Sequence, residues 1–213
     1  MDLSSRKALL LAPIMSAVIP LLWLPLAEYV AVSPWGSGAL LWAGMLFALP
    51  AMLALISFVA CPIALVFRRV RRVALVLLLC SFAFFAAFIV AARIGDRVRM
   101  RAFERLAERS APLVQAIRAY EQKNGRPPDT LQNLVPEFIS SVPSTRMGAY
   151  PEYRFITGER ATNYNGNPWM LYVYTPGGGI NFDQFMYFPL QNYPTQGYGG
   201  VLERIRDWAY LHE

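Results

Sequence analysis

The feature that most constrains this chain is an uncharged apolar run, residues 73–92, which passes without a break into an amphipathic segment. About 20 apolar residues are enough for a helix to cross the hydrocarbon core of a bilayer. Beyond the run, apolar residues recur at steps of three and four, which is typical of a helix that packs one face on a partner. This stripe comprises Met100, Phe103, Leu106, Ala107, Leu113, Val114, Ile117 and Tyr120. The pattern predicts a membrane helix that leads directly into the main helix of a water-facing domain.

Two further uncharged stretches precede this run, and each is long enough to span a bilayer. The sequence therefore predicts three transmembrane helices, at about residues 8–29, 38–67 and 73–92. We expect the second helix to tilt or bend at Pro50. The first run is too long for the apolar part of a secretory signal and no A-x-A-like site follows it, so we expect a retained helix. Residues 1–92 are then a transmembrane region, and residues 93–213 form a soluble domain.

Charge is distributed unevenly along the chain. Residues 1–92 carry a net charge of +4, residues 93–126 carry +5 and residues 127–213 carry −3, which together give +6. A nucleic-acid-binding protein is expected to carry its basic surface on the folded domain, so we expect no nucleic acid partner. Anionic lipid headgroups of the bilayer are the expected partner of the basic segment. The residues assigned to headgroup contact are Arg93, Arg97, Arg99 and Arg101.

The positive-inside rule does not decide the topology by counting alone. Arg6, Lys7 and the four arginines of residues 68–72 lie on one side, and six arginines of residues 93–109 lie on the other. Because long translocated domains follow the rule poorly, the short loop at residues 68–72 has more weight. This predicts a bacterial inner-membrane protein with a cytoplasmic N-terminus and a periplasmic domain at residues 93–213. A cytoplasmic domain is the alternative.

The amphipathic segment contains signals for its own interruption and end. Pro112 predicts a kink or a restart of the helix, with Ser110 as the cap of the new segment. Gly125, which two prolines follow closely, predicts the end of the helix. Asp129 and Gln132 have the spacing of a capping box for a short helix at residues 130–135.

The remainder of the chain is typical of a small β-sheet. Short aromatic or β-branched segments bounded by turn residues predict strands at residues 153–156, 170–174, 185–188 and 204–211. The last segment also fits one face of a helix. We favour a strand there because Tyr198-Gly199-Gly200 resembles a hairpin turn.

Residues 113–143 resemble a known family. An aliphatic helix ends in IRAYEQKNGRPP, DTLQNLVPEFISSVP follows, and an aromatic strand begins near Tyr150. This order is similar to the ectodomain of type IV pilin-like proteins, especially the major pseudopilins of type II secretion. The resemblance implies an amphipathic helix packed on a small antiparallel sheet, and envelope or secretion proteins as partners. No leader glycine precedes residues 73–92 and no glutamate lies within them, so the resemblance implies a pilin-like domain on an uncleaved three-helix anchor.

Metal and cofactor sites are not expected. Major pseudopilins hold a calcium ion in a loop beside the sheet, and Asn181 and Asp183 could offer oxygens for one. A calcium site takes six to eight oxygen ligands, so a single carboxylate is too few. The two cysteines, Cys61 and Cys80, lie within apolar runs and are expected to be buried thiols.

No catalytic signature is present in the sequence. His212 is the only histidine and lies next to the C-terminus, where chains are often frayed. Glu203 and Asp207 alternate with arginines, which favours surface ion pairs. We therefore expect a protein that is not an enzyme. Glu152 and Glu159 flank a strand and a loop without a converging group. The alternative is an enzyme of unknown chemistry that uses carboxylates of the sheet loops.

Aromatic residues are concentrated in the last third of the chain, and strand alternation predicts that roughly half of them fill the core. The others could form a surface for a ligand or a partner, because exposed Tyr and Trp are favoured at interfaces. The candidates are Tyr164, Tyr193, Tyr198 and Trp169. The sequence thus predicts an α+β membrane protein that is a periplasmic binding or assembly module, accessory to an envelope or secretion machine. An aromatic-lined glycan-binding sensor is a further alternative.

Overall fold

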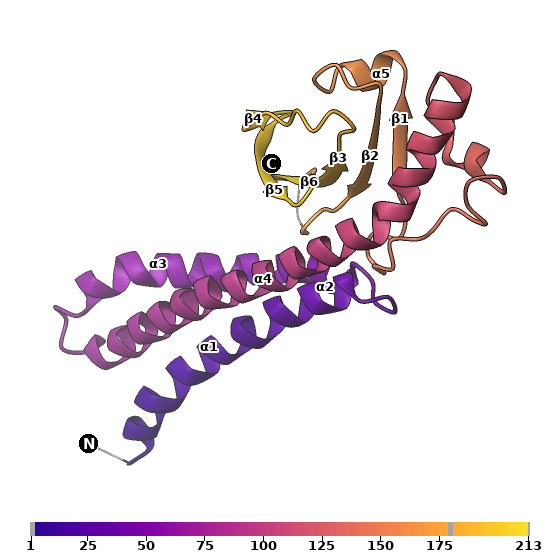
Figure 1. Cartoon of the computed structure of the whole chain (residues 1–213). Coiled ribbons are helices and arrows are strands. Elements are labelled where there is room, and N and C mark those ends of the chain that lie inside the picture. Colours follow the sequence, from indigo (N-terminus) through magenta and orange to yellow (C-terminus); the bar gives the residue numbers. More distant parts are fainter. Residues whose placement is uncertain (1–2, 179–180, 213) are drawn as a thin grey trace. The chain divides into compact units, whose positions relative to one another are not determined.

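The computed structural model describes residues 3–178 and 181–212 and divides into two compact units (Figure 1). We call the first the helical unit; it consists of Met1–Val30 and Ala39–Arg99. We call the second the head; it consists of Ala31–Gly38 and Met100–Glu213. One long helix, α4 (Arg71–Asn124), contributes residues to both units.

The remaining elements follow in chain order. The helices are α1 (Leu3–Val32), α2 (Ala39–Ala43), the 3₁₀ segment η1 (Gly44–Phe47), α3 (Ala48–Ala64), the 3₁₀ segment η2 (Leu131–Leu134) and α5 (Glu159–Thr162). The strands are β1 (Arg154–Thr157), β2 (Trp169–Tyr174), β3 (Gln184–Tyr187), β4 (Gln196–Gly197), β5 (Gly200–Ile205) and β6 (Trp208–His212).

Three helical segments are long and apolar enough to cross a membrane: Leu11–Val32, Ala39–Ala64 and Arg71–Asn124. Each overlaps one of the three predicted runs, and the third continues far beyond residue 92. The second segment is not one regular helix, because η1 separates α2 from α3 just before Pro50. A proline ring clashes with the carbonyl four residues earlier, here that of Leu46, and removes one helical hydrogen bond. A turn of 3₁₀ helix at this position is the local response.

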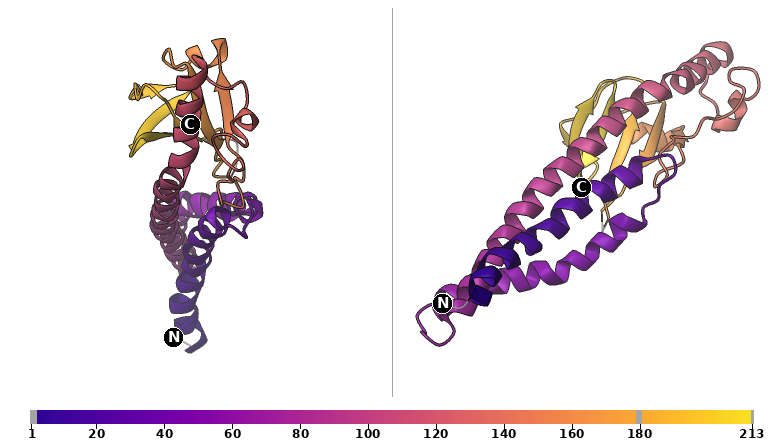
Figure 2. Two further views of the ribbon diagram at one scale, coloured as in Figure 1. Left: turned by 45° about the vertical axis from the view of Figure 1, so that its right-hand side comes forward. Right: turned by 90° about the horizontal axis from the view of Figure 1, so that it is seen from below.

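The predicted interruption of the long helix at Pro112 is wrong, because α4 continues through it without a break (Figure 2). Pro112 lies on the exposed side of the helix, where water can replace the lost backbone hydrogen bond. Ser110 does not cap a new helix. Its hydroxyl donates to the carbonyl of Leu106 at 2.6 Å and shares a 2.7 Å hydrogen bond with the hydroxyl of Tyr153.

The end of α4 is confirmed at Gly125, which has a φ of 69° and donates its N–H to the carbonyl of Glu121 at 2.8 Å. The short helix that follows is a single 3₁₀ turn, and its predicted cap is wrong by one residue. The backbone N–H of Thr130, not that of Asp129, donates to the side chain three positions on, the Oδ1 of Asn133, at 2.8 Å. A side-chain amide oxygen can accept this bond as a glutamine or glutamate would.

The head contains a six-stranded antiparallel sheet with the strand order β1-β2-β3-β6-β5-β4. The first three predicted strands are present within one residue at each end. The last segment is β-structure, as predicted, but it is a hairpin and not one strand: β5 and β6 are joined at Arg206 and Asp207. Tyr198 and Gly199, with φ of 57° and 98°, form the predicted turn between β4 and β5.

One face of the sheet packs on the C-terminal part of α4 through aromatic side chains, and Figure 1 shows this part of the helix beside the sheet. Phe103 stacks on Phe185 with ring centroids 4.8 Å apart and lies 5.0 Å from the ring of Tyr210. Polar atoms of the helix also pair with the sheet: Arg118 donates to the Tyr187 hydroxyl at 2.7 Å. The predicted apolar stripe of α4 is thus the helix side of the core, and six of its eight residues are buried.

The end of α1 and the connection after it, residues 31–38, pack within the head on residues 147–149; we call this contact the clasp. Gly148 donates its N–H to the carbonyl of Ser33 at 2.8 Å, and Ala149 donates to that of Ala31 at 3.0 Å. The last carbonyls of a helix have no partner within the helix, so the clasp satisfies that of Ala31 and adds a second donor to that of Ser33, which also accepts the N–H of Gly36. The backbones approach so closely that a Cβ atom at Gly148 would lie less than 3.0 Å from three backbone atoms of Gly36.

Candidate ligand-binding pocket on the head

The sheet face turned away from α4 carries a second small core. Its buried members come from β2, β3, β5 and β6 and from the residue after β3: Met170, Met186, Phe188, Leu202, Ala209 and Leu211. Partly buried rings and one aliphatic side chain pack against this cluster: Ile156, Tyr164, Tyr172, Tyr193 and Tyr198. Three of these tyrosines lie in two connections. Tyr164 lies in residues 158–168, before β2, and Tyr193 and Tyr198 lie in residues 188–199, after β3. Both faces of the sheet are therefore covered, one by a helix and the other by loops.

Three asparagines tie the two connections together. The side chain of Asn167 donates to the carbonyl of Tyr164 at 2.6 Å and to the Oδ1 of Asn192 at 2.8 Å, and it accepts the N–H of Leu190 at 3.0 Å. Asn165 and Asn192 exchange hydrogen bonds between side-chain amides and backbone carbonyls in both directions. Asn167 is fully buried, so its hydrogen bonds are made away from competing water. This asparagine lock fixes the loop that carries Tyr164.

A pocket of about 430 Å³ opens between the first of these connections and the sheet. Its lining comes from β1, the α5 connection, β3, β6 and the β4–β5 turn. The lining residues are Ile156, Arg160, Asn163, Tyr164, Gln184, Met186, Tyr198 and Leu211. Met186 and Leu211 are buried members of the second core, so they provide a rigid apolar floor. The pocket has the size and mixed lining that are typical of small-molecule sites.

Five polar side-chain groups around the pocket make no hydrogen bond or ion pair within the described residues. They are the guanidinium of Arg160, the amides of Asn163 and Gln184, and the hydroxyls of Tyr164 and Tyr198. Four other tyrosines of the head differ in this respect: the hydroxyls of Tyr153, Tyr187, Tyr193 and Tyr210 all have partners. Five polar groups without a protein partner among the described residues thus surround one concave place, where a ligand or water can form hydrogen bonds with them.

The two pocket tyrosines touch each other and rest on the second core. Their ring centroids are 5.0 Å apart, and each ring also meets that of Phe188 at about 6 Å with its edge toward it. Burial raises the pKa of Tyr164 and that of Tyr198 above the usual value. Both hydroxyls therefore stay protonated at neutral pH and can donate a hydrogen bond as well as accept one.

The structure brings together two of the four aromatic residues that the sequence predicted as a surface. Tyr164 and Tyr198 line the pocket, whereas Tyr193 supports it from behind. The ring of Tyr193 stacks on Phe188 at 4.6 Å, and its hydroxyl accepts the N–H of Phe188 at 2.7 Å. Trp169 does not lie on this surface. It is fully buried on the helix side of the sheet, where its indole N–H donates to Glu121 at 3.1 Å.

The other three polar residues of the pocket, Arg160, Asn163 and Gln184, are not predicted by the sequence. Arg160 and Asn163 lie in and just after α5, a single helical turn with no signal of its own in the sequence, and Gln184 begins a strand. Nothing in the local sequence marks these residues as neighbours. Only the strand order and the fold of the loop bring them to one pocket.

The four arginines assigned to lipid headgroups do not share one environment. Arg93, Arg97 and Arg101 are exposed, and their headgroup contact stays a prediction. Arg99 is different, because its side chain is only 6 % exposed and forms a paired hydrogen-bonded ion pair with Glu28 of α1 at 3.0 Å. The helices approach closely here: a Cβ atom at Gly95, one turn earlier in α4, would lie 3.1 Å from Glu28.

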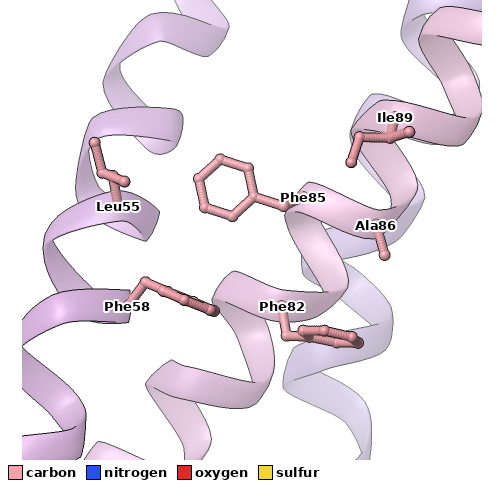
Figure 3. Close-up of a pocket in the computed structure, with 6 residues that line it drawn as sticks. All are labelled: Leu55, Phe58, Phe82, Phe85, Ala86 and Ile89. Atoms are coloured by element: carbon pink, nitrogen blue, oxygen red, sulfur yellow. The ribbon is translucent and has the colours of Figure 1, made fainter.

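Two other places in the chain lack the features of this pocket. Asp183 is buried and accepts a 2.6 Å hydrogen bond from Tyr210, and residues 3–178 and 181–212 contain no group of three or more His, Cys, Asp or Glu that could hold a metal ion. The helical unit has an apolar groove of about 460 Å³ between α3 and α4, where Phe85 points toward Leu55 above Phe58 (Figure 3). Its lining offers no polar atom for recognition.

Comparison of the chain with protein-family models, with curated proteins and with solved structures finds no match. The resemblance of residues 113–143 to pilin-like ectodomains therefore stays a prediction.

Proposed function

We propose that this chain is a membrane-anchored binding module whose head takes a small polar ligand in the pocket between Tyr164, Tyr198 and the sheet. The observation that carries the proposal is the gathering of five polar groups, all without partners in the described residues, around an apolar floor. Specific small-molecule sites combine a mostly apolar concave wall with a few polar groups that fix the orientation of the ligand. The asparagine lock supports this function because it holds one wall of the pocket in place.

Binding is favoured over catalysis by the composition of the lining. A catalytic site needs converging ionisable groups that can move protons or attack a substrate. The lining residues include no carboxylate, histidine or cysteine. Two carboxylates elsewhere in the head have side-chain partners: Glu108 pairs with Arg206, and Glu203 forms a hydrogen bond with His212. An enzyme that uses carboxylates of the sheet loops is the weaker candidate, because none of them lines the pocket.

The proposed cellular setting follows from the charge pattern and the apolar helices. Three segments able to cross a membrane would anchor the head in a bacterial inner membrane, with the arginines at 93, 97 and 101 near anionic headgroups. The short basic loop between α3 and α4 supports a cytoplasmic loop and a periplasmic head. Reporter enzymes fused after Glu213, one active only in the periplasm and one only in the cytoplasm, test this placement. Cytoplasmic activity would refute it.

A second candidate is an assembly role beside an envelope or secretion machine. The observation in its favour is that one helix of 54 residues runs from a candidate membrane span to the sheet of the head. This is the arrangement that the pilin-like resemblance implies. Crosslinking of the chain in whole cells, followed by mass spectrometry, tests it: a reproducible partner among envelope proteins supports assembly, and the absence of one argues against it.

The pocket is tested by blocking it. Asn163 is exposed at its rim, so Asn163→Trp should fill the mouth without disturbing the floor. The matched control is Glu159→Trp, an exposed residue of the same connection that does not line the pocket. Thermal unfolding of the full chain in detergent, screened against sugars, amino acids and small organic acids, should find compounds that stabilise the parent and the control but not Asn163→Trp. Equal stabilisation of all three proteins would refute binding in this pocket.

A further inference from the structure

The charge and the shape of the pocket indicate which class of small polar ligand it binds. This inference rests on the proposed function. We infer that the pocket binds a small acidic saccharide, with its carboxylate on Arg160. The sugar ring lies between the apolar floor and the rings of Tyr164 and Tyr198, which we call the tyrosine wall. Each part of this assignment follows from a different set of lining residues.

The charge is the first part. Arg160 is the one charged residue among the lining residues described, and no carboxylate of residues 3–178 or 181–212 pairs with it. A guanidinium in a partly apolar pocket selects a carboxylate or a phosphate, because its fixed fork of donors matches the paired oxygens of either group. A phosphate site is usually built from several cations or from a helix N-terminus or nest of backbone N–H groups. A single arginine therefore fits a carboxylate better.

The remaining polar groups describe the body of the ligand. Two amides and two tyrosine hydroxyls can each donate and accept hydrogen bonds, which suits hydroxyl groups, since these also do both. A fatty acid or an aliphatic acid would leave these four groups without partners, and burying polar groups without partners is costly. The body of the ligand therefore carries several hydroxyl or amide groups around its edge.

The floor and the tyrosine wall describe the faces of the ligand. Ile156, Met186 and Leu211 present apolar surface, and the rings of Tyr164 and Tyr198 add aromatic surface. A sugar ring matches both features, because its C–H faces are apolar while its edge carries hydroxyls. The volume of about 430 Å³ lies in the lower part of the range for small-molecule sites, which fits a ligand of one or two rings.

Titration calorimetry on the full chain in detergent tests the class. The acidic panel is glucuronic, galacturonic, N-acetylneuraminic and N-acetylmuramic acid. The neutral counterparts are glucose, galactose and N-acetylglucosamine, and acetate and inorganic phosphate report on charge alone. We expect at least one acidic sugar to bind roughly tenfold to a hundredfold more tightly than its neutral counterpart, the range for a hydrogen bond to a charged group. Arg160→Gln should remove this difference and leave the weak binding of the neutral sugar.

The matched control is Arg154→Gln, an exposed arginine of β1 that does not line the pocket; it should keep the preference. Equal binding of acidic and neutral sugars, or an unchanged preference in Arg160→Gln, would overturn the inference and leave the proposed function intact. Acetate or phosphate binding as tightly as the acidic sugars would also overturn it, since only an anion would then be recognised. If no acidic sugar binds, the inference falls. The proposed function falls with it only if no compound of the wider screen stabilises the parent more than Asn163→Trp.

Discussion

Replacing Gly148 with alanine should open the clasp between residues 31–38 and residues 147–149. The new Cβ would lie closer than 3.0 Å to backbone atoms of Gly36, and a backbone cannot yield by rotating a side chain. Relieving the overlap requires the two segments to separate, which breaks the hydrogen bonds from Gly148 to Ser33 and from Ala149 to Ala31. At about 1 kcal/mol for each hydrogen bond, the closed form of the clasp is destabilised by about 2 kcal/mol. The ratio of closed to open clasp then falls roughly 30-fold.

Amide hydrogen exchange of the full chain in detergent measures this change. We expect exchange at residues 148 and 149 to rise roughly 30-fold in Gly148→Ala, with the strands of the sheet unchanged. The control is Gly44→Ala, where the added Cβ meets nothing closer than an ordinary contact, 3.9 Å from the indole nitrogen of Trp23. Unchanged exchange at residues 148 and 149 would show that the close approach to Gly36 does not hold the clasp together.

Three further predictions concern buried polar groups. Glu28→Gln removes the charge that balances Arg99, so it should lower the free energy of unfolding in detergent by about 3–5 kcal/mol. Adding Arg99→Met should recover part of this loss, and no recovery would contradict the pairing. Asn167→Ala should cost about 1–3 kcal/mol and weaken ligand binding, and unchanged denaturant unfolding would refute the asparagine lock. Burial raises the pKa of the Tyr193 hydroxyl in the folded chain. As the pH rises above about 10, this hydroxyl loses its proton first in the unfolded chain, which favours unfolding, so the stability of the folded chain falls. Tyr193→Phe should therefore lose less stability than the parent between about pH 9 and about pH 12, and an equal loss would contradict the burial.

The head uses its sheet for two different purposes. On the face toward α4, large aromatic side chains interdigitate with the helix stripe and leave almost no exposed surface. On the other face, a four-residue helix and irregular loops cover the sheet, and loops cannot fill a surface as regularly as a helix does. The pocket lies at this less regular face, where part of the covering does not reach the floor at Met186 and Leu211.

Much of the architecture could be predicted from the sequence because it depends on periodicity. The apolar run at 73–92 and the stripe from Met100 to Tyr120 repeat at helical steps, so their pattern survives any arrangement of the rest of the chain. The turn at Tyr198 and Gly199 is also local, since two adjacent residues with positive φ suffice to reverse the chain. The prediction of a break at Pro112 is wrong because the free-energy cost of a proline within a helix depends on whether that side of the helix faces water.

The candidate site was decided by tertiary structure. Tyr164 and Tyr198 stand 34 positions apart in the sequence and meet at 5.0 Å only because the loops that carry them cover one sheet face together. Gln184 joins them through strand order, and Arg160 through a short helix that has no sequence signal. The sequence by itself determined where the chain is apolar, helical or extended, because those properties depend on neighbours along the chain. Which polar groups were left without partners depended on contacts across the fold, so only the folded head could reveal the pocket.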